Sequence, residues 1–138
     1  MNPTLKNILA VVVGLLLGGI VNMGIVMISG SIIAPPPGTN LTTMEGIKAA
    51  LPLFEPKHFL MPFLAHAVGT FVGALITAKM AKTRNMQLAL LIGVCYLIGG
   101  IENFRELPQS PTWFIIVDLV VAYLPMGYLG GKLITTKN

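Results

Sequence analysis

The feature that most constrains this chain is the lack of any charged residue from position 7 to position 44. Within this stretch, residues 8–28 are almost wholly apolar, and about 20 such residues form one helix across the hydrocarbon core of a bilayer. This run is longer than the hydrophobic part of a cleaved signal peptide, and Lys6 is the only basic residue before it. We therefore interpret residues 6–30 as a first membrane span.

Three further apolar stretches follow, at residues 59–79, 86–104 and 113–134. Only 10% of the 138 residues are charged, whereas a soluble domain carries about 25%. The sequence therefore predicts an all-α integral membrane protein, with four transmembrane helices in one compact bundle and a single domain over residues 1–138. Pro125 falls in the middle of the fourth span, where neighbouring helices can compensate for the hydrogen bond that it lacks.

The longest polar segment, residues 34–58, is expected to form the first outer loop. Pro35, Pro36 and Pro37 end the preceding helix, since proline has no backbone N–H to donate. Thr42 and Glu45 fit the spacing of a capping box, which predicts a short amphipathic helix over residues 43–51. We expect this helix to lie in the membrane interface.

The distribution of basic residues predicts the orientation in the membrane, because Lys and Arg accumulate on the cytoplasmic side. With both termini inside, six basic residues are cytoplasmic and three are outside. This places the N-terminus and the C-terminus in the cytoplasm, at the inner membrane if the protein is bacterial. The basic residues are scattered or lie at span ends, which argues against a nucleic-acid partner. The inner set is Lys6, Lys79, Lys82, Arg84, Lys132 and Lys137, and the outer set is Lys48, Lys57 and Arg105.

Two internal echoes suggest that the chain is a pair of related helix hairpins. Residues 69–79 and 127–137 share six of eleven positions, including two glycines and the closing lysine. Residues 18–22 (Gly-Gly-Ile-Val-Asn) resemble residues 99–103 (Gly-Gly-Ile-Glu-Asn). Corresponding spans then cross in the same direction, as in a parallel repeat. Chance similarity between helices of narrow composition remains the alternative.

Glycines four residues apart lie on one face of a helix and let two backbones approach closely. Three such pairs are present, and we interpret them as helix-packing positions. They favour a tight bundle, a homo-oligomer or docking against a larger membrane partner. The pairs are Gly14 with Gly18, Gly69 with Gly73, and Gly127 with Gly131.

Five polar residues lie inside the predicted spans, where polar groups are costly and usually have a role. At about 1.5 Å of rise per residue, all five fall in the outer half of the membrane. They come from four different spans, so the sequence predicts a polar cluster in the outer leaflet. The five are Asn22, His66, Glu102, Asn103 and Asp118.

Three interpretations of this cluster stay open. His66 pairs with Glu102 or Asp118 for structural reasons alone, or the cluster is a binding site, or His66 is a catalytic acid or base. As a binding site, His66, Glu102 and Asp118 could hold a divalent cation, carry protons or bind a headgroup. Arg105 suits an anionic headgroup at the same boundary.

Catalysis is the weakest of the three, because no nucleophile or metal motif accompanies His66. We assign no catalytic residue from the sequence. The favoured function is non-enzymatic: binding of a ligand, ion or protein partner through the polar cluster and the glycine-rich faces. A minimal oligomeric transporter or channel is the alternative, and a membrane-embedded lipid-modifying enzyme is the third hypothesis.

Overall fold

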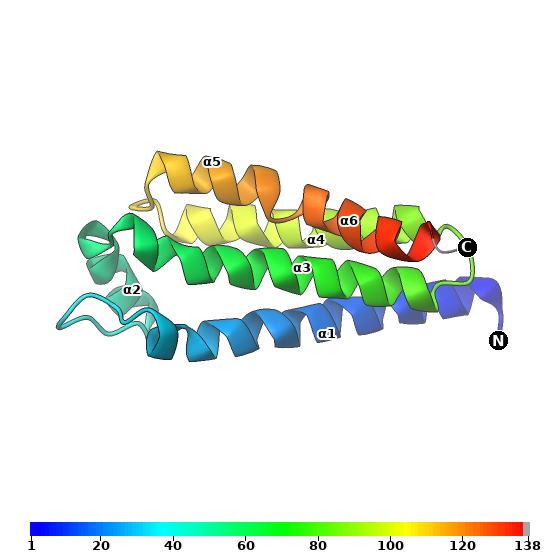
Figure 1. Cartoon of the computed structure of the whole chain (residues 1–138), viewed down its shortest axis with the longest axis horizontal. Coiled ribbons are helices and arrows are strands. Elements are labelled where there is room, and N and C mark those ends of the chain that lie inside the picture. Colours follow the sequence, from blue (N-terminus) through cyan, green and yellow to red (C-terminus); the bar gives the residue numbers. More distant parts are fainter. Residues whose placement is uncertain (137–138) are drawn as a thin grey trace.

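The computed structural model describes residues 1–136, and Lys137, which entered both the charge count and the first echo, lies outside them. Within the described residues, four helical segments are long and apolar enough to cross a membrane. By length and composition the chain is therefore an integral membrane protein, as predicted. Figure 1 shows the segments running side by side along one axis, with both termini at the same end. The segments are Pro3–Ile32, Pro56–Met80, Asn85–Glu106 and Thr112–Thr135.

The first span, α1 (Pro3–Ile32), is longer at both ends than the predicted 6–30. Asn2 caps it by accepting a hydrogen bond from the backbone N–H of Thr4 at 2.7 Å. Thirty helical residues extend about 45 Å, so α1 exceeds the roughly 30 Å thickness of the hydrocarbon core. The last helical residue is Ile32, and the backbone of Ile33 is extended, just before the run of prolines.

The first loop contains the short helix α2 (Met44–Ala50) and the 3₁₀ turns η1 (Leu51–Leu53) and η2 (Pro56–Phe59). The cap of α2 is Thr43, whose side chain accepts from the N–H of Gly46 at 3.0 Å. The predicted capping box at Thr42 is therefore wrong by one residue. Thr42 instead donates its hydroxyl proton to Asn40 Oδ1, within an Asn-initiated turn.

The next two long helices are α3 (Leu60–Met80), in the second span, and α4 (Asn85–Glu106), the third span. The turn between them passes through Arg84, the only described non-glycine residue with a positive φ, at 54°. Asn7 of α1 fastens this turn by accepting from the N–H of Lys82 at 2.9 Å and donating to Thr83 Oγ1 at 2.8 Å.

The fourth span is two helices rather than the single one predicted over residues 113–134. It consists of α5 (Thr112–Val121) and α6 (Leu124–Thr135). Pro125 lies in the first turn of α6. It has no N–H for the carbonyl of Val121, and its ring would clash with that carbonyl in a continuous helix. The interruption is visible between α5 and α6 in Figure 1.

The helices α1 and α3 meet along a glycine seam, which we define as Gly14, Gly18, Gly69 and Gly73. A Cβ added to Gly14 would lie 2.7 Å from Gly73 O, and one added to Gly18 would lie 2.6 Å from Gly69 O. No side chain fits between these backbones, so the two helices are in direct main-chain contact. The seam closes the part of the bundle nearer the termini.

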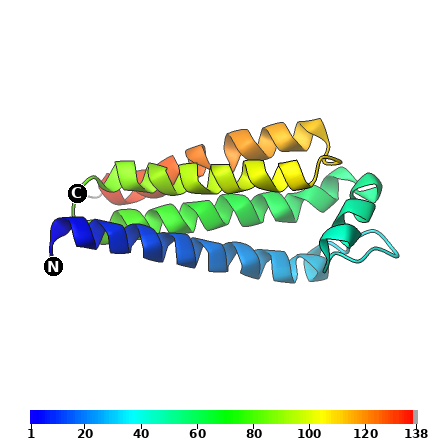
Figure 2. The ribbon, with the colours of Figure 1, turned by 180° about the vertical axis from the view of Figure 1, so that it is seen from behind.

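The pair α4 and α6 makes a similar contact. A Cβ on Gly127 would lie 3.2 Å from Ala89 O and 3.3 Å from Gly93 Cα. A Cβ on Gly131 would lie 2.8 Å from the side chain of Ala89. The two helix hairpins are thus each held by close backbone approach, and α3 is the central helix, packed against α1, α4 and α6 (Figure 2).

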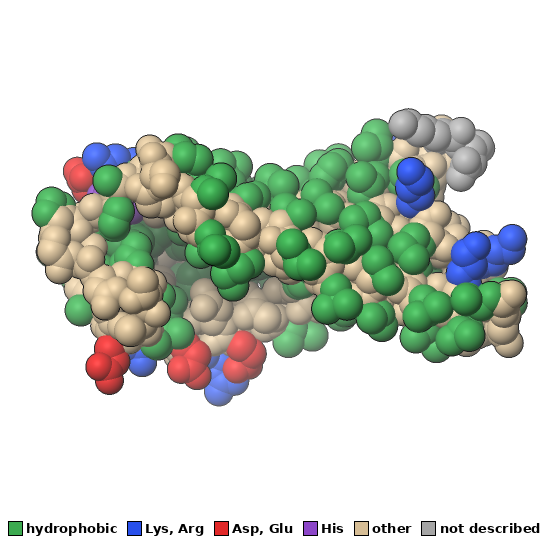
Figure 3. Space-filling model, turned by 90° about the horizontal axis from the view of Figure 1, so that it is seen from below, with side chains coloured by type: hydrophobic (Ala, Val, Ile, Leu, Met, Phe, Trp, Pro, Cys, Tyr) green, Lys and Arg blue, Asp and Glu red, His purple; other side chains and the backbone are tan. Residues whose placement is uncertain are grey.

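At the end away from the termini, apolar side chains of η1, η2, α4 and α5 form one core cluster, in which Phe59 packs on Phe114 with ring centroids 4.6 Å apart. This cluster fixes the first loop against the bundle. In Figure 3 all the acidic side chains in view are at this same end, while the opposite end shows only basic ones. The buried members of the cluster are Leu51, Phe59, Phe104, Leu107 and Phe114.

Candidate functional site

A cavity of about 270 Å³ lies among α1, α3 and α4, on the side of the glycine seam away from the termini. Its floor is α3, and its two sides are α1 and α4. It is open on one side, and Figure 3 shows the surface hollowed close to the end that carries the acidic side chains. The lining is unusual for a membrane span because most of its members are glycine or polar. They include Asn22, His66, Thr70, Tyr96, Asn103 and Tyr123.

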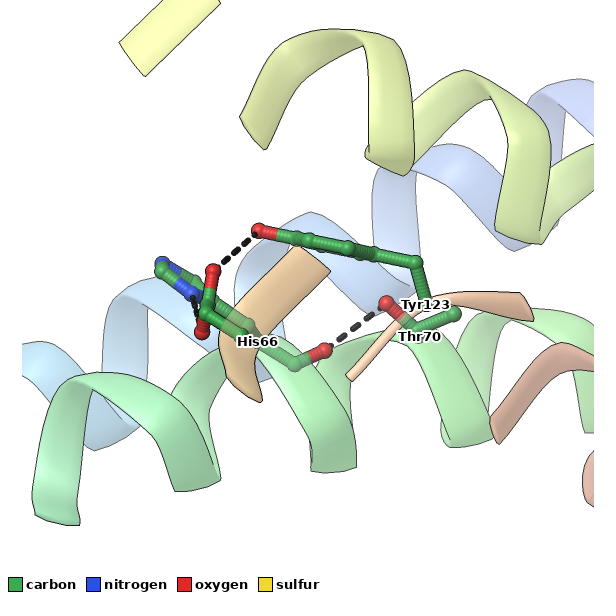
Figure 4. A network of polar contacts seen from close by, with 4 residues as sticks. His66, Thr70 and Tyr123 are labelled. Carbon is green, nitrogen blue, oxygen red and sulfur yellow. Dashed lines mark hydrogen bonds and ion pairs between the residues drawn. The ribbon is translucent and has the colours of Figure 1, made fainter. Parts of the chain in front are cut away.

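Beside this cavity, His66 of α3 pairs with Asp118 of α5. His66 Nδ1 lies 2.8 Å from Asp118 Oδ1, and the Asp118 side chain is fully buried. Tyr123 Oη donates to the other carboxylate oxygen of Asp118 at 3.2 Å. An ionised carboxylate only accepts hydrogen bonds, so in that state of Asp118 the shared proton belongs to His66 Nδ1. Figure 4 shows the three side chains converging.

The break in the fourth span positions Tyr123 for this contact. Tyr123 lies between α5 and α6, with φ −113° and ψ −75°. Its ring rests on Gly100 of α4, where an added Cβ would lie 2.6 Å from the Tyr123 hydroxyl oxygen. The ring also stacks on His66, with centroids 5.8 Å apart. Pro125 therefore supports the site without entering it, whereas Gly100 both lines the cavity and leaves room for the tyrosine ring.

Two asparagines approach the cavity from its opposite sides, Asn22 from α1 and Asn103 from α4. Asn22 Oδ1 is buried and has no hydrogen-bond partner among the described residues. A buried acceptor without a partner is rare in native proteins and marks a strained, hydrated or ligand-binding position. Asn22 is therefore the most informative residue in the cavity.

The three hydroxyl groups in the lining have their protons committed elsewhere. Thr70 donates to His66 O at 2.7 Å, Tyr96 donates to Leu15 O, and Tyr123 donates to Asp118. Each oxygen keeps lone pairs that can accept from a ligand. The cavity therefore offers an excess of hydrogen-bond acceptors.

Glu102 does not join His66 and Asp118, although the sequence placed it at the same depth. Its side chain is 61% exposed and accepts from Arg105 Nη1 at 3.0 Å, one helical turn away. Arg105, the predicted headgroup contact, is 73% exposed in this surface pair. The described residues contain no group of three His, Cys, Asp or Glu side chains placed to hold a metal ion. Of the three suggested cation ligands, His66 and Asp118 are thus brought together and Glu102 is not.

Sequence reasoning did not assign Thr70, Tyr96 or Tyr123 to the site. A tyrosine hydroxyl in an apolar helix requires a hydrogen-bond partner, and that requirement was the available signal for Tyr96 and Tyr123. The glycines of the second echo were a further signal, since Gly19, Gly99 and Gly100 all line the cavity.

Fold and cavity together define an all-helical, multi-pass membrane protein with a polar pocket inside its bundle. Comparison with models of protein families, with curated proteins and with solved structures finds no match to this chain.

Proposed function

We propose that this protein is a non-enzymatic membrane protein that binds a small polar group in the cavity between α1, α3 and α4. The observation that carries the proposal is Asn22 Oδ1, a buried acceptor that lacks a partner among the described residues and belongs to a polar cavity. Leaving such a buried group unsatisfied lowers the stability of the fold by about 1–3 kcal/mol. A ligand that donates to this oxygen would recover that cost.

Transport through a single protomer is less well supported. A transport pathway has to continue toward the end of the bundle that holds the termini. There α1 and α3 are in main-chain contact at the glycine seam, and Thr77 donates to Ala10 O at 3.0 Å across the same interface. A transporter or channel would therefore need either a large separation of these helices or a path between protomers of an oligomer.

A membrane-embedded enzyme is the second candidate, and the His66–Asp118 pair favours it. A carboxylate that fixes the proton of an imidazole on Nδ1 leaves Nε2 for acid–base chemistry. However, the cavity lining includes no serine or cysteine, and Thr70 directs its hydroxyl proton to a backbone carbonyl. The pair then orients a ligand-binding imidazole rather than activating a nucleophile.

The proposed binding site also offers an explanation for the internal echoes in the sequence. Gly127 contacts Gly93 where Gly69 contacts Asn22, so by these contacts the counterpart of Asn22 is Gly93. The similarity between residues 18–22 and residues 99–103 instead pairs Asn22 with Asn103. On α4, Asn103 lies about three helical turns beyond Gly93. Both copies of this echo line the cavity from opposite sides. We propose that the similarity reflects the shared site, whether or not the hairpins arose by duplication.

We also propose that both termini face the cytoplasm and that α2 lies in the outer membrane interface. The basic side chains at the terminal end and the acidic ones at the opposite end support this orientation (Figure 3). The cavity then belongs to the outer half of the bilayer.

Native mass spectrometry of protein released from membranes in a mild detergent tests the proposed function. The wild-type protein is expected to carry an adduct, and Gly19→Leu, which places a side chain in the cavity, is expected to lose it. Gly24→Leu is the matched control, since a Cβ on Gly24 meets nothing within 4 Å and Gly24 does not line the cavity. An unadducted wild-type protein, or equal adducts in all three forms, would overturn the proposal.

A further inference from the structure

We infer that the ligand is a membrane lipid with an uncharged, hydroxyl-bearing headgroup, which enters the cavity sideways between α1 and α4. This inference rests on the proposed function and specifies its ligand. It is carried by three independent properties of the cavity: where it opens, which hydrogen bonds it offers and which charges it lacks.

The opening lies between α1 and α4, which contact each other less than each contacts α3 and which the hydrogen bond from Tyr96 Oη to Leu15 O joins at one point. α1 packs along α3, whereas α4 packs against α3 and α6, so α1 and α4 stand on either side of α3. Gly19 and Gly99 leave the gap free of side chains: a Cβ on Gly99 would meet nothing within 4 Å, and one on Gly19 would come no closer than 3.9 Å to Tyr96 Oη. A gap between two membrane-spanning helices faces hydrocarbon, so the direct route into the cavity is from the lipid.

The hydrogen-bond groups of the cavity call for a donor-bearing ligand. The oxygens of Thr70, Tyr96 and Tyr123 have only lone pairs to offer, and Asn22 Oδ1 is an unpaired acceptor. The amide nitrogens of Asn22 and Asn103 supply donors from the two sides. A ligand hydroxyl both donates and accepts, so a group with two or three hydroxyls matches this set.

The charges of the cavity disfavour an anionic headgroup. His66 is the only ionisable side chain in the lining other than the tyrosines, and Asp118 already pairs with it. No lysine or arginine lines the cavity, whereas phosphate recognition relies on such side chains. An uncharged headgroup is also the cheapest to draw into the span, because a charge inside the bilayer costs several kcal/mol.

The size of the cavity agrees with a headgroup rather than a whole lipid. Pockets that enclose a complete drug-sized ligand span about 300–1,000 Å³. A glycerol-sized headgroup fits inside, and its acyl chain leaves through the gap between Gly19 and Gly99.

Thermal unfolding in detergent micelles, followed in the presence of added ligand, tests the inference. The probes are 1-monooleoylglycerol, free glycerol and oleoyl lysophosphatidic acid, which share a glycerol unit but differ in tail and charge. We expect monooleoylglycerol to raise the Tm of the wild-type protein and to bind at least tenfold more weakly to Asn22→Leu and to Gly19→Leu. Gly24→Leu is expected to respond as the wild type does.

Each other result contradicts a stated part of the inference. An equal rise in Tm with glycerol at the same concentration would identify the ligand as a free solute and refute a lipid. An equal rise in Tm with the lysophosphatidic acid would refute the preference for an uncharged headgroup. Wild-type affinity in both Asn22→Leu and Asn103→Leu would refute recognition by the two amides. No response to monooleoylglycerol, while the native protein still carries an adduct that Gly19→Leu loses, would refute the inference but leave the proposed function standing.

Discussion

Asn22 shows most clearly how a single residue of this protein is placed for something other than stability. Its side chain lies against Gly69 of α3, where a Cβ on that glycine would come within 2.9 Å of Asn22 Cβ. Its amide oxygen remains buried without a partner among residues 1–136. A leucine has nearly the same shape and would leave no polar group unsatisfied.

Asn22→Leu is therefore expected to raise the free energy of unfolding by about 1–3 kcal/mol, the usual cost of an unsatisfied buried polar group, even as it weakens ligand binding. Thermal unfolding in micelles, followed by the fluorescence of Trp113, measures the gain. Asn103→Leu is the comparison, since Asn103 is exposed and should gain little. A lower Tm for Asn22→Leu would mean that the amide stabilises the apo protein.

The His66–Asp118 pair leads to a second expectation at this scale. His66→Leu leaves the fully buried carboxylate of Asp118 with only Tyr123 as a partner, and breaking such a pair costs about 3–5 kcal/mol. The double variant His66→Leu/Asp118→Leu removes the uncompensated carboxylate as well. We therefore expect the double variant to unfold at a higher temperature than His66→Leu. Strictly additive losses in this double-mutant cycle would show that the two side chains do not interact.

The sequence predicted part of this site. Depth in the membrane correctly suggested that His66 has a carboxylate partner, and it left two choices, Glu102 and Asp118. Depth alone could not separate them, because the direction in which a residue faces depends on how each helix is rotated about its axis. α4 turns Glu102 toward the surface and Gly100 toward Tyr123, and only the packing of the fourth span on α4 reveals this.

At the scale of the helices, the interruption between α5 and α6 has a specific task. Tyr123 lies in this interruption, and its hydroxyl reaches Asp118. The sequence identified Pro125 but predicted an unbroken span, because neighbouring helices often compensate for a proline. Here the ring and the missing N–H end α5 at Val121.

Pro125→Ala is expected to let the N–H of residue 125 bond to the carbonyl of Val121 and so to join α5 and α6. The amides of residues 123, 124 and 126 should then exchange with deuterium more slowly than in the wild type, while those of α3 should be unchanged. Hydrogen exchange followed by mass spectrometry gives both rates. Unchanged exchange at residues 123, 124 and 126 would show that packing, rather than proline, maintains the break.

For the whole molecule, the bilayer explains why the architecture was predictable. Backbone groups in hydrocarbon must be satisfied within their own segment, so long apolar runs become helices and charged segments become their ends. The four spans follow from that rule, and their ends lie within a few residues of the predicted ones. The relative rotation and tilt of the helices do not follow from it, which is why the cavity could be located only from the structure.

The proposed orientation can be tested with two single-cysteine variants in a Cys95→Ala background. Gln109→Cys lies in the exposed turn between α4 and α5, and Thr136→Cys lies after α6 at the other end. A membrane-impermeant maleimide applied to intact bacterial cells whose outer membrane has been permeabilised should label Gln109→Cys at once and Thr136→Cys only after lysis. The reverse pattern would place both termini outside.

The glycine seam has a consequence for the timing of ligand exchange. Contacts between two backbones contain no side chains that can rotate aside, so α1 cannot yield to a bulky headgroup by small local adjustments. Widening the gap requires α1 to move away from α3 as a rigid rod, and Asn7 ties one end of that rod to the turn before α4. The residence time of a bound lipid should therefore follow the strength of the seam, which borders the cavity at Gly69, more closely than the contacts that the headgroup itself makes.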